Sequence, residues 1–335
     1  MPFQILSLSG GGFLGLYTIS LLTQLEEKLG KPIASCFDLL AGTSIGGIIA
    51  LGLALEKPAK EIKSAFERNG VQIFSGRAAP RNRIEEWRDF YRSLFKSKYD
   101  GKALYKTIVD LVGEDTVLAN LKHRTIIPTV NLTKGKPQVF KTAHHKDFQL
   151  DWKRRVVDVA LAAAAAPTYF PIAEIDDELF VDGGLYANSP DLLALHEAEH
   201  FLNVQTEDVK ILSIGTTTTR FSFSHVGKRD LGVLGWGRRL AHTMISSQQL
   251  DVSYILTHKL GNRYLRLDEV QSKEQERDLG LDVTTQAAQQ TIRGIAAGSF
   301  QASINNNLLA DMLRHEPPQP QFYHAVDSVI TEAVH

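Results

Sequence analysis

The sequence contains almost no cysteine and almost no excess of charge of either sign. The single cysteine, Cys36, excludes an internal disulfide framework and is typical of a reducing compartment. Lysine and arginine number 37 and aspartate and glutamate 38, so the formal net charge is −1. That balance gives no reason to expect binding to a DNA or RNA polymer.

Signals for export and for membrane insertion are also missing. The first residues, Met1–Ile5, lack the basic segment that begins a signal peptide. Residues 39–55 form an uncharged run of 17 residues, at the lower limit for a membrane span. The run contains four glycines as well as Thr43 and Ser44, which favours a buried strand followed by a helix. We therefore expect a soluble, cytoplasmic protein.

Short apolar runs alternate with amphipathic segments along much of the chain. Strands are expected at residues 3–9, 37–41, 125–132, 138–142, 179–182, 209–215 and 263–267. The alternation predicts an α/β fold with three layers, in which helices cover both faces of a central, mostly parallel sheet. We expect a core at residues 1–225. A mostly helical part at 226–335 would pack on that core and, as a hypothesis, regulate it.

Gly42-Thr43-Ser44-Ile45-Gly46 is the most informative stretch of the chain. It lies between an expected strand and an expected helix, which is the context that a nucleophile elbow requires. Gly42 and Gly46 remove the Cβ atoms that would collide across a sharp, strained turn. The N-terminus of the following helix would favour an alkoxide or an oxyanion at Ser44. The alternative is an ordinary glycine-rich turn.

A glycine loop at residues 10–15, Gly-Gly-Gly-Phe-Leu-Gly, follows the first expected strand. It matches the Gly-x-Gly-x-x-Gly fingerprint of dinucleotide-binding proteins. That fingerprint calls for an acidic residue at the end of the second strand, where this chain has Ala41. The other use of such a loop is to line an oxyanion hole with backbone amides.

Phe180-Val181-Asp182-Gly183-Gly184 places a carboxylate at the end of an expected strand. Strand ends at one edge of an α/β sheet are where active sites assemble. His196-Glu197-Ala198-Glu199-His200 matches the His-Glu-x-x-His zinc motif, but a suitable third ligand does not follow. A polar helix face is the preferred interpretation of that segment.

Taken together, these motifs resemble the patatin-like phospholipase family. The resemblance covers roughly residues 3–267. Its elements, in chain order, are the glycine loop, Gly42–Gly46, Ala164–Pro171, Asp182–Gly184 and Leu212–Thr216.

The resemblance implies hydrolysis of phospholipid acyl esters by a Ser–Asp dyad, without a catalytic histidine, metal or other cofactor. Ser44 would be the nucleophile and Asp182 the base. The oxyanion hole is assigned to the glycine loop, with Gly10, Gly11 and Gly12 as its residues, and to the Ile45 amide.

Two positions depart from the family pattern. Leu14 stands in the glycine loop where the family usually has Arg or Lys, which raises the question of how the loop is held. Asn188-Ser189-Pro190 replaces Asn-Asn-Pro, a change that we expect to be tolerated.

Residues 226–313 exceed what a catalytic core needs. In this respect the chain resembles bacterial antiphage effectors of the family that a cyclic oligonucleotide activates. Arginines are candidates for phosphate contacts, the alternative being that they solvate helices; they are Arg238, Arg239, Arg263, Arg266 and Arg293. Gly232–Trp236 is interpreted as core rather than as a membrane-binding lip.

Further partners follow from the resemblance. The substrate would be membrane phospholipid, reached by peripheral contact at the inner face of the membrane, and activation is hypothesised to involve an oligomer. Between Arg77 and Lys106 nine basic residues face four acidic ones, which suggests either a solvated face or a surface for anionic headgroups.

Two alternatives remain open at this point. One is an unregulated lipase or esterase with a Ser-His-Asp triad, for which several histidines are candidates; they are His196, His200, His225, His242 and His258. The other is a non-enzymatic protein that keeps the patatin fold, which would be expected to have lost Ser44 or Asp182.

Overall fold

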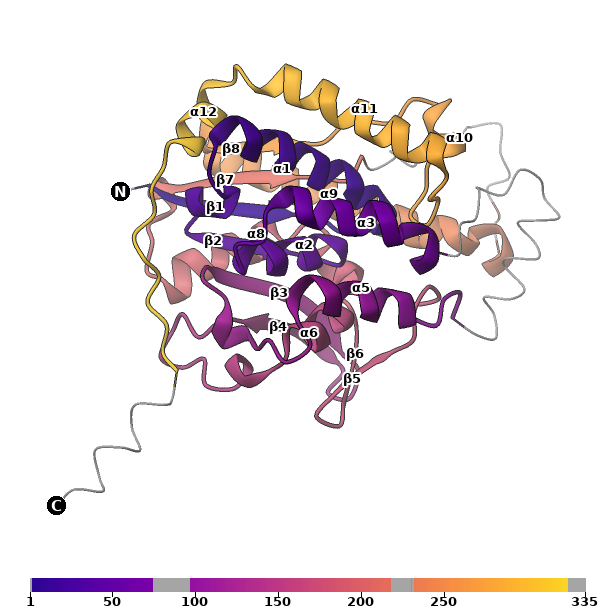
Figure 1. The fold of residues 1–335 in the computed structure, drawn as a ribbon, viewed down its shortest axis with the longest axis horizontal. Coiled ribbons are helices and arrows are strands. Elements are labelled where there is room, and N and C mark those ends of the chain that lie inside the picture. Colours follow the sequence, from indigo (N-terminus) through magenta and orange to yellow (C-terminus); the bar gives the residue numbers. More distant parts are fainter. Residues whose placement is uncertain (1, 75–96, 218–229, 231, 325–335) are drawn as a thin grey trace.

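An eight-stranded sheet forms the centre of the computed structural model (Figure 1), which describes residues 2–74, 97–217, 230 and 232–324, except for the side chains of 233–235, 237–239 and 241. The strand order is β5-β6-β3-β2-β1-β7-β8, and β4 also pairs with β3. The strands are β1 (Phe3–Leu8), β2 (Leu39–Gly42), β3 (Arg124–Asn131), β4 (Lys136–Lys141), β5 (Ala173–Ile175), β6 (Glu178–Asp182), β7 (Val209–Ile214) and β8 (Tyr264–Leu267).

The sheet is parallel in its centre and at the β8 edge, and antiparallel at the other. β1 pairs in parallel with β2 and β7, as β2 does with β3 and β7 with β8. The pairs β3–β4, β3–β6 and β5–β6 are antiparallel. The expected mostly parallel sheet is therefore confirmed. The three-residue β5 was missed because so short a segment carries no periodic pattern.

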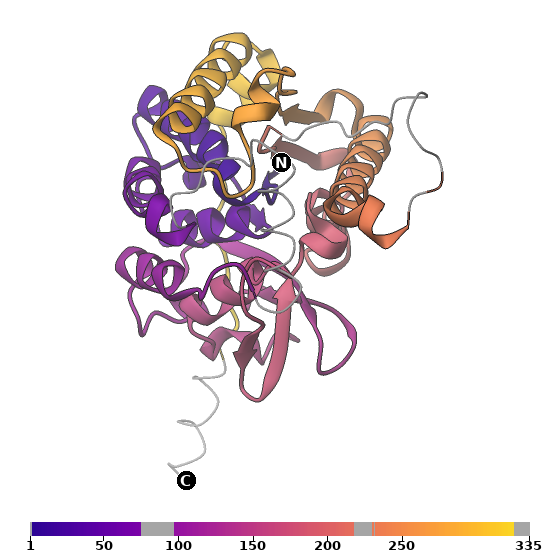
Figure 2. The ribbon, with the colours of Figure 1, turned by 90° about the vertical axis from the view of Figure 1, so that its right-hand side faces the viewer.

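Helices cover both faces of the sheet (Figures 1 and 2), which confirms the expected three-layer architecture. One layer packs on the face that bears Leu6, Leu8 and Leu40. It consists of α1 (Gly15–Leu29), α2 (Ile45–Ala54), α3 (Ala59–Ile73), α5 (Lys102–Val112), α6 (Val156–Ala164) and α11 (Gln286–Ser303).

The opposite face bears Ile5, Leu39 and Ala41, as the alternation of side chains along a strand requires. It is covered by α8 (Asp191–His196), the π-helix η5 (Glu197–Phe201) and α9 (Val233–Leu260). The remaining helices are short: η1 (Gly12–Leu14), η2 (Ile33–Cys36), η3 (Leu118–Asn120), η4 (Asp151–Lys153), α7 (Gly184–Ala187), η6 (Thr206–Asp208), η7 (Gly261–Arg263), α10 (Gln275–Asp278) and α12 (Asn307–Leu313).

The C-terminal part of the chain continues the fold of the core. β8 extends the sheet beyond β7, and α11 lies along α1, where the Tyr17 hydroxyl donates to Ser299 Oγ at 2.9 Å. The expected boundary at residue 225 lies outside the described residues, so the division into two parts stays a prediction. Within the described ranges, no helix is both long and apolar enough to cross a bilayer.

Candidate active site

Ser44 occupies the turn between β2 and α2 in a strained conformation. Its φ of 54° and ψ of −125° place a residue with a Cβ atom in a region that such residues rarely adopt. A Cβ added to Gly42 would lie 2.2 Å from the Gly46 carbonyl oxygen, and one on Gly46 would lie 2.3 Å from that of Leu8. The turn therefore requires both glycines, and it leaves Ser44 partly exposed among buried neighbours.

Asp182 ends β6 and is buried. Burial raises the pKa of its carboxyl group to about 6, although hydrogen bonds from the Ser44 hydroxyl and the Gly184 amide act to lower it. The Gly184 N–H donates to Asp182 Oδ1 at 2.7 Å, which leaves the other carboxylate oxygen outside that bond. The structure thus brings together Ser44 and Asp182, which are 138 residues apart in the sequence.

The amides assigned to the oxyanion hole divide into two groups. The Gly10 N–H donates to the Asn188 carbonyl at 2.9 Å, so Gly10 supplies no free donor, and its assignment is wrong in that respect. The amides of Gly11, Gly12 and Ile45 donate to no other group in the part of the chain that the structure describes. Gly11 and Gly12 are partly exposed, as Ser44 is, which leaves their N–H groups available to an oxyanion.

Asn188 and Thr216 hold the glycine loop from two sides. Asn188 Nδ2 donates to the Gly10 carbonyl at 3.2 Å, and Thr216 Oγ1 donates to the same oxygen at 3.1 Å. The loop also depends on the C-terminal part, because the Phe13 N–H donates to the Leu281 carbonyl at 2.7 Å. Gly12 lies against that carbonyl with a φ of 55°, and an added Cβ would come within 2.3 Å of it.

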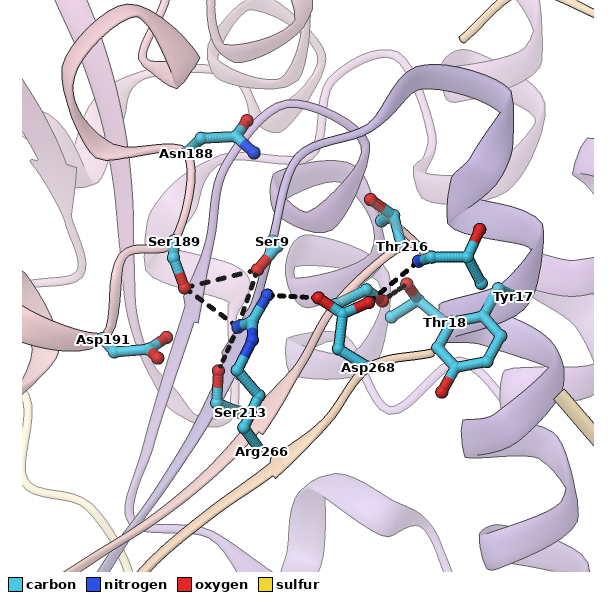
Figure 3. A network of polar contacts seen from close by, with 12 residues as sticks. Ser9, Tyr17, Thr18, Asn188, Ser189, Asp191, Ser213, Thr216, Arg266 and Asp268 are labelled. Atoms are coloured by element: carbon cyan, nitrogen blue, oxygen red, sulfur yellow. Dashed lines mark hydrogen bonds and ion pairs between the residues drawn. The ribbon is translucent and has the colours of Figure 1, made fainter. Parts of the chain in front are cut away.

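Beneath the loop, a polar network joins β1, β7 and β8 (Figure 3). Its centre is Arg266, whose guanidinium contacts the hydroxyls of Ser9, Ser189 and Ser213 and the carboxylate of Asp268. Sequence reasoning missed this role for Arg266. The only signal was an arginine within an otherwise apolar strand segment.

The zinc-motif residues are engaged in other interactions. Glu197 is buried against His144 and Lys141. The imidazole rings of His196 and His200 stack on each other with centroids 5.2 Å apart. Glu199 accepts a bond from the Thr206 hydroxyl. Within the described ranges, no three His, Cys, Asp or Glu residues are grouped in a way that would hold a metal ion.

Of the histidines proposed for a triad, the four that the structure describes, His196, His200, His242 and His258, are not among the groups that act on Asp182. Within the described residues, only Ser44 and Gly184 hydrogen-bond its carboxylate. His258 is exposed and bonds the Tyr254 carbonyl at 2.8 Å. His225 lies outside the described residues, as does most of the basic run from Arg77 to Lys106.

The candidate phosphate-binding arginines are also largely engaged within the protein. Arg263 donates to the carbonyl oxygens of Thr206 and Val209, and Arg293 pairs with Glu67 at 2.8 Å. Arg266 is committed to the network beneath the glycine loop. The side chains of Arg238 and Arg239 lie outside the described part, as do those of residues 233–235 in the Gly232–Trp236 segment.

Comparison with known proteins shows which family this sequence is similar to. The family model of the patatin-like phospholipases matches residues 6–195. The chain is 39% identical to a cGAMP-activated phospholipase of Pseudomonas aeruginosa, over 99% of this chain and 98% of that protein. Proteins of the same name from Vibrio cholerae and Escherichia coli are 40% and 37% identical, over 93% and 91% of this chain and 94% and 91% of their own.

Proposed function

The chain belongs to the patatin-like phospholipase family, and on that premise we propose that it hydrolyses acyl esters of membrane phospholipids through Ser44 and Asp182. The observation that carries the proposal is the pairing of a strained serine with a buried carboxylate of raised pKa, beside backbone amides that have no partner among the described residues. Membership also removes the reason to interpret the glycine loop as a dinucleotide site.

In the first step, Ser44 Oγ attacks the ester carbonyl carbon while its proton passes to Asp182. The carbonyl oxygen becomes an oxyanion, which accepts hydrogen bonds from the N–H groups of Gly11, Gly12 and Ile45. The tetrahedral intermediate then collapses, and Asp182 returns the proton to the departing lysophospholipid oxygen. The fatty acid remains on Ser44 as an acyl-enzyme.

The same carboxylate takes a proton from water, which attacks the acyl-enzyme. It then returns that proton to Ser44 Oγ as the bond to the acyl group breaks and the fatty acid leaves, which completes the cycle. A solvated aspartate is a weak base, but burial makes Asp182 a stronger one by raising its pKa to about 6. At neutral pH most molecules would still hold the ionised form that the reaction needs.

We further propose that a cyclic di- or trinucleotide switches the enzyme on, in antiphage defence. Three relatives that match nearly the whole chain are named as cGAMP-activated. In support, the C-terminal part contacts the glycine loop directly through the Leu281 carbonyl, and its Arg266 contacts Ser9, which immediately precedes the loop. A ligand that shifts this part would also shift the oxyanion amides.

Peripheral contact with the inner face of the membrane is part of the same proposal. Leu185, in the short helix that follows Asp182, is 49% exposed. Leu240 and Met244 of α9 are 50% and 54% exposed and lie one helical turn apart. α9 is joined to the site, because the Asn188 N–H donates to Gln248 Oε1 at 2.6 Å. An oligomer that forms on activation remains a prediction.

The deciding experiment measures release of fatty acid from vesicles of mixed phospholipids by the purified protein, with and without a panel of cyclic di- and trinucleotides that includes cGAMP. We expect one ligand to raise the rate about a hundredfold, which corresponds to about 2.7 kcal/mol of differential binding. Ser44→Ala in the presence of that ligand is the matched control. Equal rates with and without every ligand would leave an unregulated lipase, and no release under any condition would favour the non-enzymatic alternative.

A further inference from the structure

Arg266 is a charged side chain in an unusual place. It comes from β8, the edge strand contributed by the C-terminal part, yet its side chain is only 14% exposed. A buried guanidinium is unfavourable unless a carboxylate and several acceptors satisfy it. The partners of Arg266 therefore decide whether it can be buried there.

Its acceptors come from both sides of the glycine loop. Arg266 Nη1 lies 3.3 Å from Ser9 Oγ, 3.1 Å from Ser189 Oγ and 2.7 Å from Ser213 Oγ. Ser9 immediately precedes the three glycines, and Ser189 follows Asn188, which bonds Gly10 through both its carbonyl and its amide group. Figure 3 shows the guanidinium between these hydroxyls.

Asp268 fixes the guanidinium from the other side. Its Oδ2 accepts from Arg266 Nη2 at 2.7 Å, and its Oδ1 accepts the Thr217 N–H at 3.0 Å. Thr216, which immediately precedes Thr217, donates to the Gly10 carbonyl. The ion pair thus connects to the glycine loop by two routes, one through the serine hydroxyls and one through residues 216–217.

We propose that Arg266 is a positioning residue that holds the glycine loop in the geometry in which the Gly11 and Gly12 amides face the oxyanion. The loop contains no charged side chain of its own, since Leu14 is apolar and buried. Arg266 lies 257 residues from Ser9 in the sequence and supplies a cation beside that residue, which immediately precedes the loop. The proposal rests on the proposed function in one respect, that Ser44 generates an oxyanion which these amides stabilise.

The test uses the full-length protein, a soluble p-nitrophenyl ester and saturating cyclic nucleotide where one is required. The variants are Arg266→Met, the double variant Arg266→Met with Asp268→Asn, and Arg266→Lys. The double variant keeps the test decisive if Arg266→Met alone fails to fold, because it leaves no unpaired buried carboxylate. Tyr264→Phe is the matched control. It removes a buried hydrogen bond of 2.7 Å to Asp191 from the same strand, without touching the loop.

We expect the double variant to lower kcat about a hundredfold with KM changed by less than about threefold, because misplaced amides weaken only the transition state. Arg266→Lys should recover part of that loss. Tyr264→Phe should lose stability and keep its kcat. If the double variant and Tyr264→Phe had the same kcat, whether unchanged in both or lowered equally in both, the proposal would be overturned.

Hydrogen exchange provides a readout that does not need catalysis. The amides of Ser9 and Gly10 are bonded to the carbonyls of Ile214 and Asn188 in the wild type. They should exchange faster in the double variant than in Tyr264→Phe if Arg266 holds the loop. If the wild type hydrolyses no ester, the proposed function fails, and exchange rates at residues 9–10 still decide whether Arg266 positions the loop. Unchanged exchange there would refute it.

Discussion

Two polar clusters in this protein contain the side chains from which hydrolases are built, and only one has the features of an active site. The His144 cluster comprises Lys141, Thr142, His144 and Glu197. Thr142 Oγ1 lies 2.8 Å from His144 Nδ1, and His144 Nε2 lies 2.9 Å from Glu197 Oε1. This hydroxyl–imidazole–carboxylate line has the connectivity of a catalytic triad.

The clusters differ in what they leave unsatisfied. In the His144 cluster the second carboxylate oxygen of Glu197 accepts from Lys141 at 2.5 Å, and the hydroxyl, imidazole and carboxylate are all buried. Burial lowers the pKa of His144. At Ser44 the backbone is strained, the serine is partly exposed, and three amides nearby have no partner within the described residues. Backbone N–H groups without a partner beside an accessible, strained serine thus distinguish the active site better than the types of side chain do.

Removing either member of the dyad should produce the largest effect. Ser44→Ala and Asp182→Ala should each lower kcat by at least about 10⁴-fold, because nucleophile and base act as a unit. Ester hydrolysis and circular dichroism of the same samples would measure activity and folding. His144→Ala, or a change at His196, His200, His225, His242 or His258, that damaged kcat equally in a folded protein would contradict the dyad.

Breaking the His144 cluster should affect stability and leave catalysis intact. Glu197→Gln removes a buried carboxylate from two partners and should lower the free energy of unfolding by about 3 kcal/mol. Urea denaturation would measure that loss, and kcat of the folded fraction should stay within about twofold of the wild type. A large loss of kcat without a loss of stability would mean that the cluster takes part in the reaction.

The raised pKa of Asp182 should be visible in two pH profiles with opposite signs. Hydrolysis needs the ionised carboxylate, so kcat/KM should rise with pH through about 6. Stability should change in the other direction. The folded-state pKa lies above that of the unfolded chain, so the contribution of Asp182 to stability is complete below the unfolded value of 3.8 and is lost as pH rises through about 6.

Asp182→Asn is the control for this test because an asparagine side chain cannot ionise. Relative to the wild type it should gain about 2 to 3 kcal/mol of unfolding free energy between pH 4 and pH 7, measured by denaturant titration at each pH. A difference that does not change with pH would show that the carboxyl group has an ordinary pKa in the folded protein.

Chelation should have the smallest effect. We expect hydrolysis to continue unchanged in EDTA, since Asp182 accepts the proton that a metal-bound hydroxide would otherwise take. Glu197, the glutamate of the His-Glu-x-x-His segment, hydrogen-bonds His144 and Lys141 instead. Stoichiometric zinc in purified active protein, with activity lost on chelation and restored on addition of zinc, would refute this expectation.

The sequence was informative where local constraints dominate. The turn at Ser44 needs Gly42 and Gly46 for steric reasons, and all three lie within five consecutive residues, so the motif can be recognised from the sequence alone. The sheet could be recognised for a similar reason, because the buried strands β1, β2 and β7 are short and mostly apolar. The antiparallel pairing of β6 with β3 joins segments that are distant in sequence and was not predicted. β5 was missed because three residues carry no periodic pattern.

The supports of the glycine loop were hidden because they act across the whole chain. Asn188 takes up the Gly10 amide that had been assigned to the oxyanion hole. Ser189, expected to be a tolerated substitution, accepts a bond from Arg266. Arg266 had been grouped with arginines available for phosphate, and its apolar strand neighbours were the only indication that it is buried. Such roles depend on which strands become adjacent, and periodicity does not report that.

The distance in sequence between Ser9 and Arg266 has a consequence for the time at which the protein becomes active. Synthesis proceeds at about 5–20 residues per second, so the arginine emerges from the ribosome about 13 to 50 seconds after the serine, 257 residues later. Leu281, whose carbonyl also anchors the loop, follows it. A nascent chain that already exposes Ser44 and Asp182 therefore lacks both anchors, so the active site of this phospholipase would be completed only near the end of its own translation.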